Sequence, residues 1–207
     1  MGEQNKSIDE QIAVLQNAYN PHGIAFSTSP ANRTWTINAT WVQDSNAVET
    51  FKPEFKRKLH KGDFRTVNLY IVKNLGPYGT CPLAMAQAQV AKPDKELLDG
   101  CLVRTDTLPG SAIEMVNGGK TAVHEIGHWF GLWHPYENHG LVDGPNGPSG
   151  CLSNNDEVDD TPAMKDRVEN CDSPKDTCPK QPGNDPLDNY MGNCPDRFMT
   201  TFTPGQV

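Results

Sequence analysis

Three histidines and a glutamate stand close together in the pattern H-E-x-x-H-x-x-G-x-x-H: His124, Glu125, His128 and His134. On a helix, His124 and His128 lie one turn apart on the same face, so both imidazoles can bind one metal ion. Glu125 stands beside the first ligand, where its carboxylate can reach a water on that ion. Gly131 can end the helix in the left-handed conformation, and the chain can then bring His134 back as a third ligand. Three imidazoles and a water are typical of an open, catalytic zinc site.

The alternative is an amphipathic core helix whose histidines are incidental. Such a helix would bury Val123, Ile126 and Phe130 equally well. It would have no use for three histidines and a glutamate that converge on one point. We therefore interpret the motif as a zinc site with Glu125 as its general base.

The motif resembles that of the metzincin metalloproteases, in which a methionine turn follows the third histidine. Met191, within Asn189-Tyr-Met-Gly, is the corresponding methionine. The resemblance implies that Met191 packs as an apolar floor under the three histidines and does not bind the metal. It also implies a zincin-like α+β fold: a twisted mixed sheet with a backing helix and an active-site helix, then a loop-rich lower subdomain stapled by disulfides.

Within the metzincins, the chain is similar to the pappalysin type (peptidase family M43), and nearest to its small secreted members. The similarity covers the whole chain and is strongest over 119–134 and 151–206, where it includes the acidic stretch Asp156–Pro162 and the ending Phe-Thr-Pro-Gly-Gln. It implies the disulfides Cys81–Cys101, Cys151–Cys178 and Cys171–Cys194, whose pairing the sequence alone leaves open.

The same similarity implies a structural calcium ion, held by the Asp156 carboxylate and the main-chain oxygens of Val158 and Thr161. Hard oxygen ligands close in sequence are those that calcium prefers. A solvated acidic loop is the alternative.

Two departures from the pappalysin pattern bear on activity. Related proteases often carry a tyrosine two residues after the turn methionine, which donates to the oxyanion, whereas this chain has Asn193 there. Asn193 or Tyr190 is then the candidate oxyanion donor. The chain also stops at Val207, where relatives usually continue into a closing helix.

Composition limits the partners and the compartment. The net charge is −8, with no basic block and no long apolar run, which argues against nucleic acid and membranes as partners. Six cysteines and the sequons at Asn5, Asn32 and Asn38 favour disulfides and secretion. The first residues form no signal region, so we interpret the chain as a mature domain or an incomplete gene, with cytosolic residence as the alternative. We expect a monomer.

Periodicity predicts the elements that position the motif. These are a helix over 7–19 opened by Ser7, a strand over 34–43, a short basic helix or turn over 51–61, a buried strand over 65–73, and extended segments over 83–90 and 100–105. The segment 140–186 is poor in apolar residues and reads as loop. One catalytic domain with two subdomains, 1–131 and 132–207, follows.

The sequence therefore predicts a secreted zinc-dependent metalloendopeptidase that hydrolyses internal bonds of protein substrates. Glu125 takes the proton of a zinc-activated water in this interpretation. One rival is a catalytically impaired secreted binding module. Another is a zinc hydrolase that acts on non-peptide amides. No residue of the chain distinguishes this activity from that of an endopeptidase.

Overall fold

A computed structural model describes residues 2–26, 29, 32–83, 93–136, 151, 156–168 and 170–207. The chain divides into two compact units, Met1–Gly131 and Leu132–Val207. All the helices and strands found in the described residues lie in the first unit.

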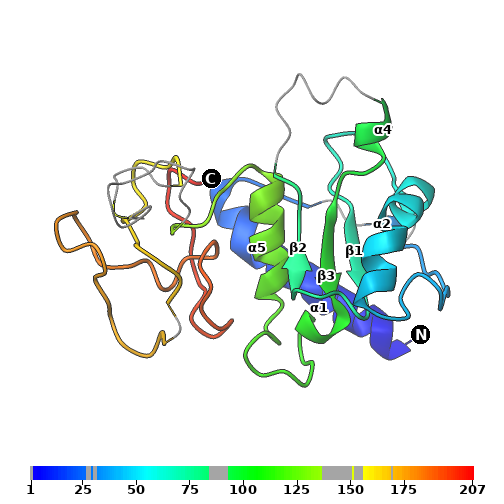
Figure 1. Ribbon diagram of the computed structural model, residues 1–207, viewed down its shortest axis with the longest axis horizontal. Coiled ribbons are helices and arrows are strands. Elements are labelled where there is room, and N and C mark those ends of the chain that lie inside the picture. The colour runs from blue at the N-terminus through cyan, green and yellow to red at the C-terminus, as the bar shows by residue number, and fades with distance from the viewer. Residues whose placement is uncertain are drawn as a thin grey trace. The chain divides into compact units, whose positions relative to one another are not determined.

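The first unit contains a mixed three-stranded sheet (Figure 1). Its strands are β1 (Leu69–Val72), β2 (Gly79–Thr80) and β3 (Cys101–Arg104), in the order β1-β3-β2. Strand β1 runs parallel to β3 with Leu69 opposite Cys101, and β2 runs antiparallel to β3 with Gly79 opposite Val103. Strand β3 is therefore central, and β2 is an edge strand of the sheet that the described residues form.

Helix α2 (Ser45–Leu59) packs against one face of this sheet. It begins at Asp44, whose carboxylate accepts a hydrogen bond from Ala47 N at 2.8 Å and so caps the helix. The apolar cluster between helix and sheet consists of Trp41, Val48, Phe55, Tyr70, Val72, Leu75 and Leu102. Because side chains alternate along a strand, Cys101 and Val103 of β3 face the opposite way.

Helices α1 (Gly2–Tyr19) and α5 (Lys120–Trp129) pack together, and α5 also contacts β2 and β3. The described residues of this unit also form three short helices: η1 (Asn20–His22), α4 (Pro93–Glu96) and η3 (Thr105–Thr107). The sheet thus lies between α2 on one face and α5 on the other (Figure 1). None of the helices within the described residues is both long and apolar enough to cross a membrane.

Some predicted elements differ from the structure. The predicted strand over 34–43 is wrong: this segment is irregular and then turns, because the Asn38 side chain accepts hydrogen bonds from Thr40 N and Trp41 N. Ile37 is fully exposed as a result. Ser7 does not open the first helix, which already begins at Gly2.

Other predictions agree in type and differ in length. Of the predicted helix or turn over 51–61, residues 51–59 are helical as part of the longer α2, which ends at Leu59. The predicted strand over 65–73 is confirmed only over Leu69–Val72, and that over 100–105 is confirmed as β3. The predicted extended segment 83–90 lies outside the described residues, apart from its first residue.

The second unit has no helix or strand among its described residues, only a bridge between Asn189 and Thr201. The loop prediction for 140–186 agrees with this wherever those residues are described. Disulfides Cys151–Cys178 and Cys171–Cys194 cross-link the unit, and Cys81–Cys101 lies in the first unit. These are the pairs that the resemblance implies. A small core of Met164, Val168, Cys171 and Cys194 accompanies them.

Lys56 of α2 is a buried cation behind the sheet. Its side chain is 4% exposed, and Nζ donates to Leu98 O at 2.9 Å and to Gly100 O at 2.6 Å. Burial, helped by the charge of Lys52, lowers the pKa of Lys56 from 10.5 to about 8, against the opposing effect of Asp99 and Glu49.

The lowered pKa of Lys56 predicts a stability that rises with pH. Between pH 8 and 10.5 the unfolded chain holds a proton that native Lys56 has lost, so unfolding costs more free energy as pH rises, by up to about 3 kcal/mol. Above pH 10 the raised pKa of buried Tyr70 acts in the opposite direction.

Urea unfolding at pH 7.5 and 9.5 measures this effect. Lys56→Met should be less stable overall, because two carbonyls lose their donor, but should lack the rise with pH. Lys58→Met, at an exposed position of the same helix, should keep the rise. A Lys56→Met protein with the full rise would contradict the assignment.

Candidate metal centre

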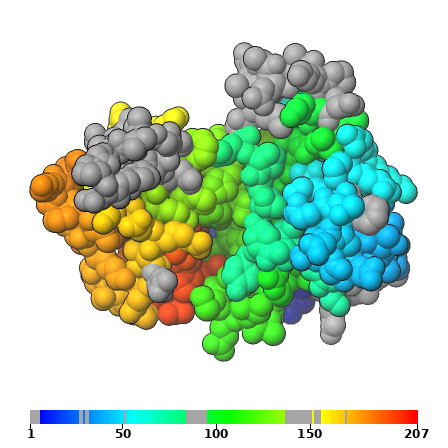
Figure 2. All heavy atoms as spheres, in the orientation of Figure 1, coloured from blue at the N-terminus to red at the C-terminus, as the bar shows by residue number. Residues whose placement is uncertain are grey.

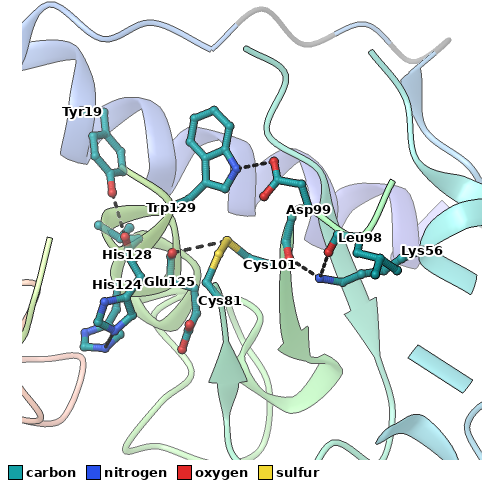
Figure 3. The surroundings of a disulfide bond; sticks show 12 residues. Tyr19, Lys56, Cys81, Leu98, Asp99, Cys101, His124, Glu125, His128 and Trp129 are labelled. Atoms are coloured by element: carbon teal, nitrogen blue, oxygen red, sulfur yellow. Dashed lines mark hydrogen bonds between the residues drawn. A yellow bond between two sulfur atoms is a disulfide. The ribbon is translucent and has the colours of Figure 1, made fainter. Parts of the chain in front are cut away.

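Helix α5 carries His124, Glu125 and His128 and is held along its length by three side-chain hydrogen bonds, of which Figure 3 shows those of Tyr19 and Trp129. These are Gln11 Nε2 to Gly119 O at 2.9 Å, Tyr19 Oη to Val123 O at 2.8 Å, and Trp129 Nε1 to Asp99 Oδ2 at 2.8 Å. Because donors or acceptors come from α1 and from the turn before β3, the helix is fixed at its start, middle and end.

The three histidines of the motif come together. Each offers one ring nitrogen, and these atoms all lie within 4.8 Å of one another. The Nε2 atoms of His124 and His128 are 3.1 Å apart. Two nitrogens at about 2.0–2.1 Å from a tetrahedral zinc ion would be about 3.3 Å apart. The donor set therefore fits zinc in chemistry, and the His124–His128 pair fits it in spacing as well.

Gly131 shapes the chain between the helix and the third histidine. Its φ is 99°, in the left-handed region, and its N–H donates to His128 O at 2.9 Å, which closes the end of α5. The chain leaves the helix there and reaches His134 three residues later. The left-handed conformation expected of Gly131 is confirmed.

Tyr136 supports His134 and was not singled out from the sequence. The two rings stack with centroids 4.9 Å apart and planes within 5° of parallel. Tyr136 in turn packs against the core cluster around Met164. Aromatic residues occur too often for one two positions after a ligand to indicate, from the sequence alone, that its ring stacks on that ligand.

Removing the Tyr136 ring should weaken metal binding. Partners that orient a ligand typically contribute about 10- to 100-fold in metal affinity, and we expect Tyr136→Ala to lose zinc affinity in that range. Tyr136→Phe keeps the stacked ring and should bind zinc normally, as should Tyr78→Ala elsewhere. Competition with a chromophoric chelator measures the affinity, and equal affinity in Tyr136→Ala and the parent protein would exclude the role.

Glu125 lies in the same turn of α5 and is 6% exposed. Burial raises the pKa of its carboxyl to about 8 in the metal-free protein. A cation held by the adjacent imidazoles would offset that cost and favour the ionised form. A buried carboxylate beside three converging histidines is thus an arrangement that fits a bound cation.

Met191 is completely buried within the second unit. Its N–H donates to Asn189 Oδ1 at 2.8 Å, and the Asn189 amide pairs with Gln206 through Nδ2 to Oε1 at 2.8 Å and Nε2 to Oδ1 at 3.3 Å. The methionine turn is therefore tied to the last residues of the chain. Sequence reasoning noted both segments but not this pairing.

The two candidate oxyanion donors have different surroundings. The Asn193 side-chain amide makes two hydrogen bonds with the main chain of Val168. Its Nδ2 donates to Val168 O at 2.9 Å, and its Oδ1 accepts from Val168 N at 3.3 Å. Tyr190 is 5% exposed, its ring packs on Phe202, and burial raises the pKa of its phenol. A protonated phenol remains a donor at neutral pH.

The acidic loop contains a buried carboxylate. Asp156 is 4% exposed; Oδ1 accepts from Val158 N at 3.2 Å, and Oδ2 has no hydrogen-bond partner in the described residues. Burial raises the pKa of Asp156, while the Thr161 side chain and the Val158 amide act to lower it. A buried oxygen without a donor is suited to a cation ligand.

No family model matches the chain. It is 38% identical over 200 residues to an extracellular metalloprotease of Neurospora crassa, covering 96% of this chain and 63% of that protein. It is also 38% identical over 204 residues to an extracellular metalloprotease of Pyricularia oryzae, covering 97% of this chain and 64% of that protein. The chain thus spans less than two thirds of the length of these relatives.

Solved structures of mirolysin have the same fold. Mature mirolysin of Tannerella forsythia in complex with a cleaved peptide matches with a TM-score of 0.64 and 25% identity, covering 97% of this chain and 81% of that one. Mirolysin in complex with compound 9 matches with a TM-score of 0.65, 24% identity and the same coverage. The chain therefore has the metzincin-like α+β fold of mirolysin, and its sequence is similar to extracellular metalloproteases.

Proposed function

We propose that the protein is a secreted zinc-dependent metalloendopeptidase of the pappalysin type. The observation that carries this proposal is the convergence of three histidine nitrogens beside the buried Glu125. The relatives are named extracellular metalloproteases, and mirolysin has been seen with a cleaved peptide, which supports peptide substrates and an extracellular location.

In the proposed reaction, His124, His128 and His134 hold zinc through their ring nitrogens. Bound zinc supplies an acidified water and a Lewis acid for the scissile carbonyl. Glu125 accepts the proton of the attacking water and then donates it to the leaving amine. Met191 packs as an apolar floor for the ligands. Tyr190 and Asn193 are the two candidate oxyanion donors, and the Asn193 amide is engaged with Val168.

The substrate is proposed to lie extended along strand β2. This strand is an edge of the sheet, and an extended peptide can add to such an edge through main-chain hydrogen bonds. The residues around β2 are accessible: Tyr78 is 40% exposed, and Figure 2 shows this segment at the surface. Helix α5, with Glu125, packs against the same strand.

Casein digestion with and without a zinc chelator tests the proposal. Zinc-dependent appearance of new peptide termini within casein supports it. The rival is a protease-like binding module, which the engaged Asn193 amide favours. A zinc-loaded protein that leaves casein and a library of unfolded proteins intact would establish that rival.

We also propose a calcium ion at Asp156, with the main-chain oxygens of Val158 and Thr161. Calcium should then raise the thermal unfolding temperature, because a ligand that binds only the native state stabilises it by RT ln(1 + [L]/Kd). Asp156→Asn should abolish the rise, whereas Asp172→Asn, at an exposed position of the same unit, should keep it. An equal rise in both variants would exclude this site.

A further inference from the structure

We propose that Gly79 of β2 is a positioning residue for Glu125: its lack of a side chain leaves the space that the glutamate carboxylate occupies. The inference rests on the proposed function for its catalytic consequence. The contact itself does not depend on that function.

The Glu125 side chain lies directly against the main chain at Gly79. A Cβ added to Gly79 would be 2.5 Å from Glu125 Oε1, 2.6 Å from Cγ and 2.8 Å from Cδ. Non-bonded heavy atoms are normally separated by about 3.5–4.0 Å. Any other residue at this position would therefore overlap three atoms of the glutamate.

Strand β2 cannot easily move away to make room. Gly79 is paired with Val103, and the next residue of β3, Arg104, donates its N–H to Tyr78 O at 2.9 Å. Two residues beyond Gly79, the Cys81–Cys101 disulfide joins the chain covalently to the first residue of β3. Cys101 and Val103 are completely buried, so β3 is itself held in the core.

The main chain of Glu125 is also held in place. Cys101 Sγ lies 3.3 Å from Glu125 O (Figure 3), and Tyr19 fixes the carbonyl of Val123 two residues earlier. With both backbones restrained, the mobile part is the end of the glutamate side chain. A methyl group at position 79 should therefore displace the carboxylate and leave the fold intact.

A displaced general base predicts a selective loss of turnover. Misplacing a reacting group by about 1 Å can cost on the order of 10²-fold in rate, and we expect Gly79→Ala to lower kcat by about 10- to 100-fold. KM and zinc content should stay within about twofold of the parent, because the added methyl group changes neither the main-chain hydrogen-bonding groups of β2 nor the histidines.

Gly76→Ala is the matched control. It adds the same methyl group three residues earlier, where the new Cβ would meet only Ser45 Cβ at 4.0 Å. Its kcat, KM and zinc content should equal those of the parent. If Gly79→Ala also keeps kcat within twofold of the active parent protein, the inference is overturned.

A double-mutant cycle on unfolding tests the contact without any catalysis. The measured quantity is the factor by which Gly79→Ala raises the unfolding equilibrium constant of the metal-free protein. This factor should be about three- to tenfold larger in the parent than in a Glu125→Ala background, which lacks the overlapping atoms. Equal effects in the two backgrounds would overturn the inference.

The two measurements separate the two hypotheses. If the parent protein cleaves no peptide, the proposed function fails and the cycle alone decides whether Gly79 positions Glu125. If the parent is active, the kcat of Gly79→Ala and the cycle must agree for the inference to stand.

Discussion

Replacing Glu125 with alanine should reduce peptide hydrolysis by about 10²–10⁴-fold or more while zinc remains bound, because a positioned general base contributes that much to rate. Glu125 is 6% exposed and adjacent in sequence to His124, and the proposed mechanism gives it the role of base and not of ligand. The three imidazoles that converge are unchanged in this variant.

The informative comparison uses three variants. Glu125→Gln keeps the shape but cannot accept a proton, so it should be as inactive as Glu125→Ala. Glu114→Ala, at an exposed position shortly before α5, should retain full activity. The assay is the initial rate on casein or a quenched fluorescent peptide, with zinc measured by elemental analysis. Near-parental activity in Glu125→Gln would refute the role of this residue as the base.

Removing zinc should have the second large effect, a loss of at least about 10³-fold, since a catalytic ion contributes several kcal/mol to transition-state stabilisation. In the proposed mechanism, a chelator removes the zinc ion that His124, His128 and His134 would hold beside Glu125. Activity should return when zinc is restored after the chelator is removed.

His134→Ala tests whether the third nitrogen belongs to this centre. We expect it to lose most of its zinc and its activity together, because two imidazoles from one helix turn make a weaker site than three. His22→Ala, at a position in η1, should behave as the parent protein. Full zinc occupancy in His134→Ala would mean that the centre is built from other ligands.

Much of the fold could be anticipated where a local signal was strong. The end of the first helix at Tyr19, the apolar strand at Leu69–Val72 and the left-handed Gly131 follow from local sequence preferences. The strand prediction for 34–43 is wrong because the alternation of side-chain types is only a statistical signal, which the turn at Asn38 overrides. Isolated β-propensity does not supply a partner strand.

The spacing of His124, His128 and His134 is a local property, because helix geometry and one glycine bring their nitrogens together. The contacts that hold them are not local. Tyr19 reaches Val123 from 104 residues away, and Gly79 reaches Glu125 from a separate strand. The amino-acid order alone therefore sufficed to propose the ligands and the base, since their chemistry depends on residue type and helical spacing. Only the packing of distant segments could reveal what orients them, because a glycine or a tyrosine gains that role from its neighbours in space.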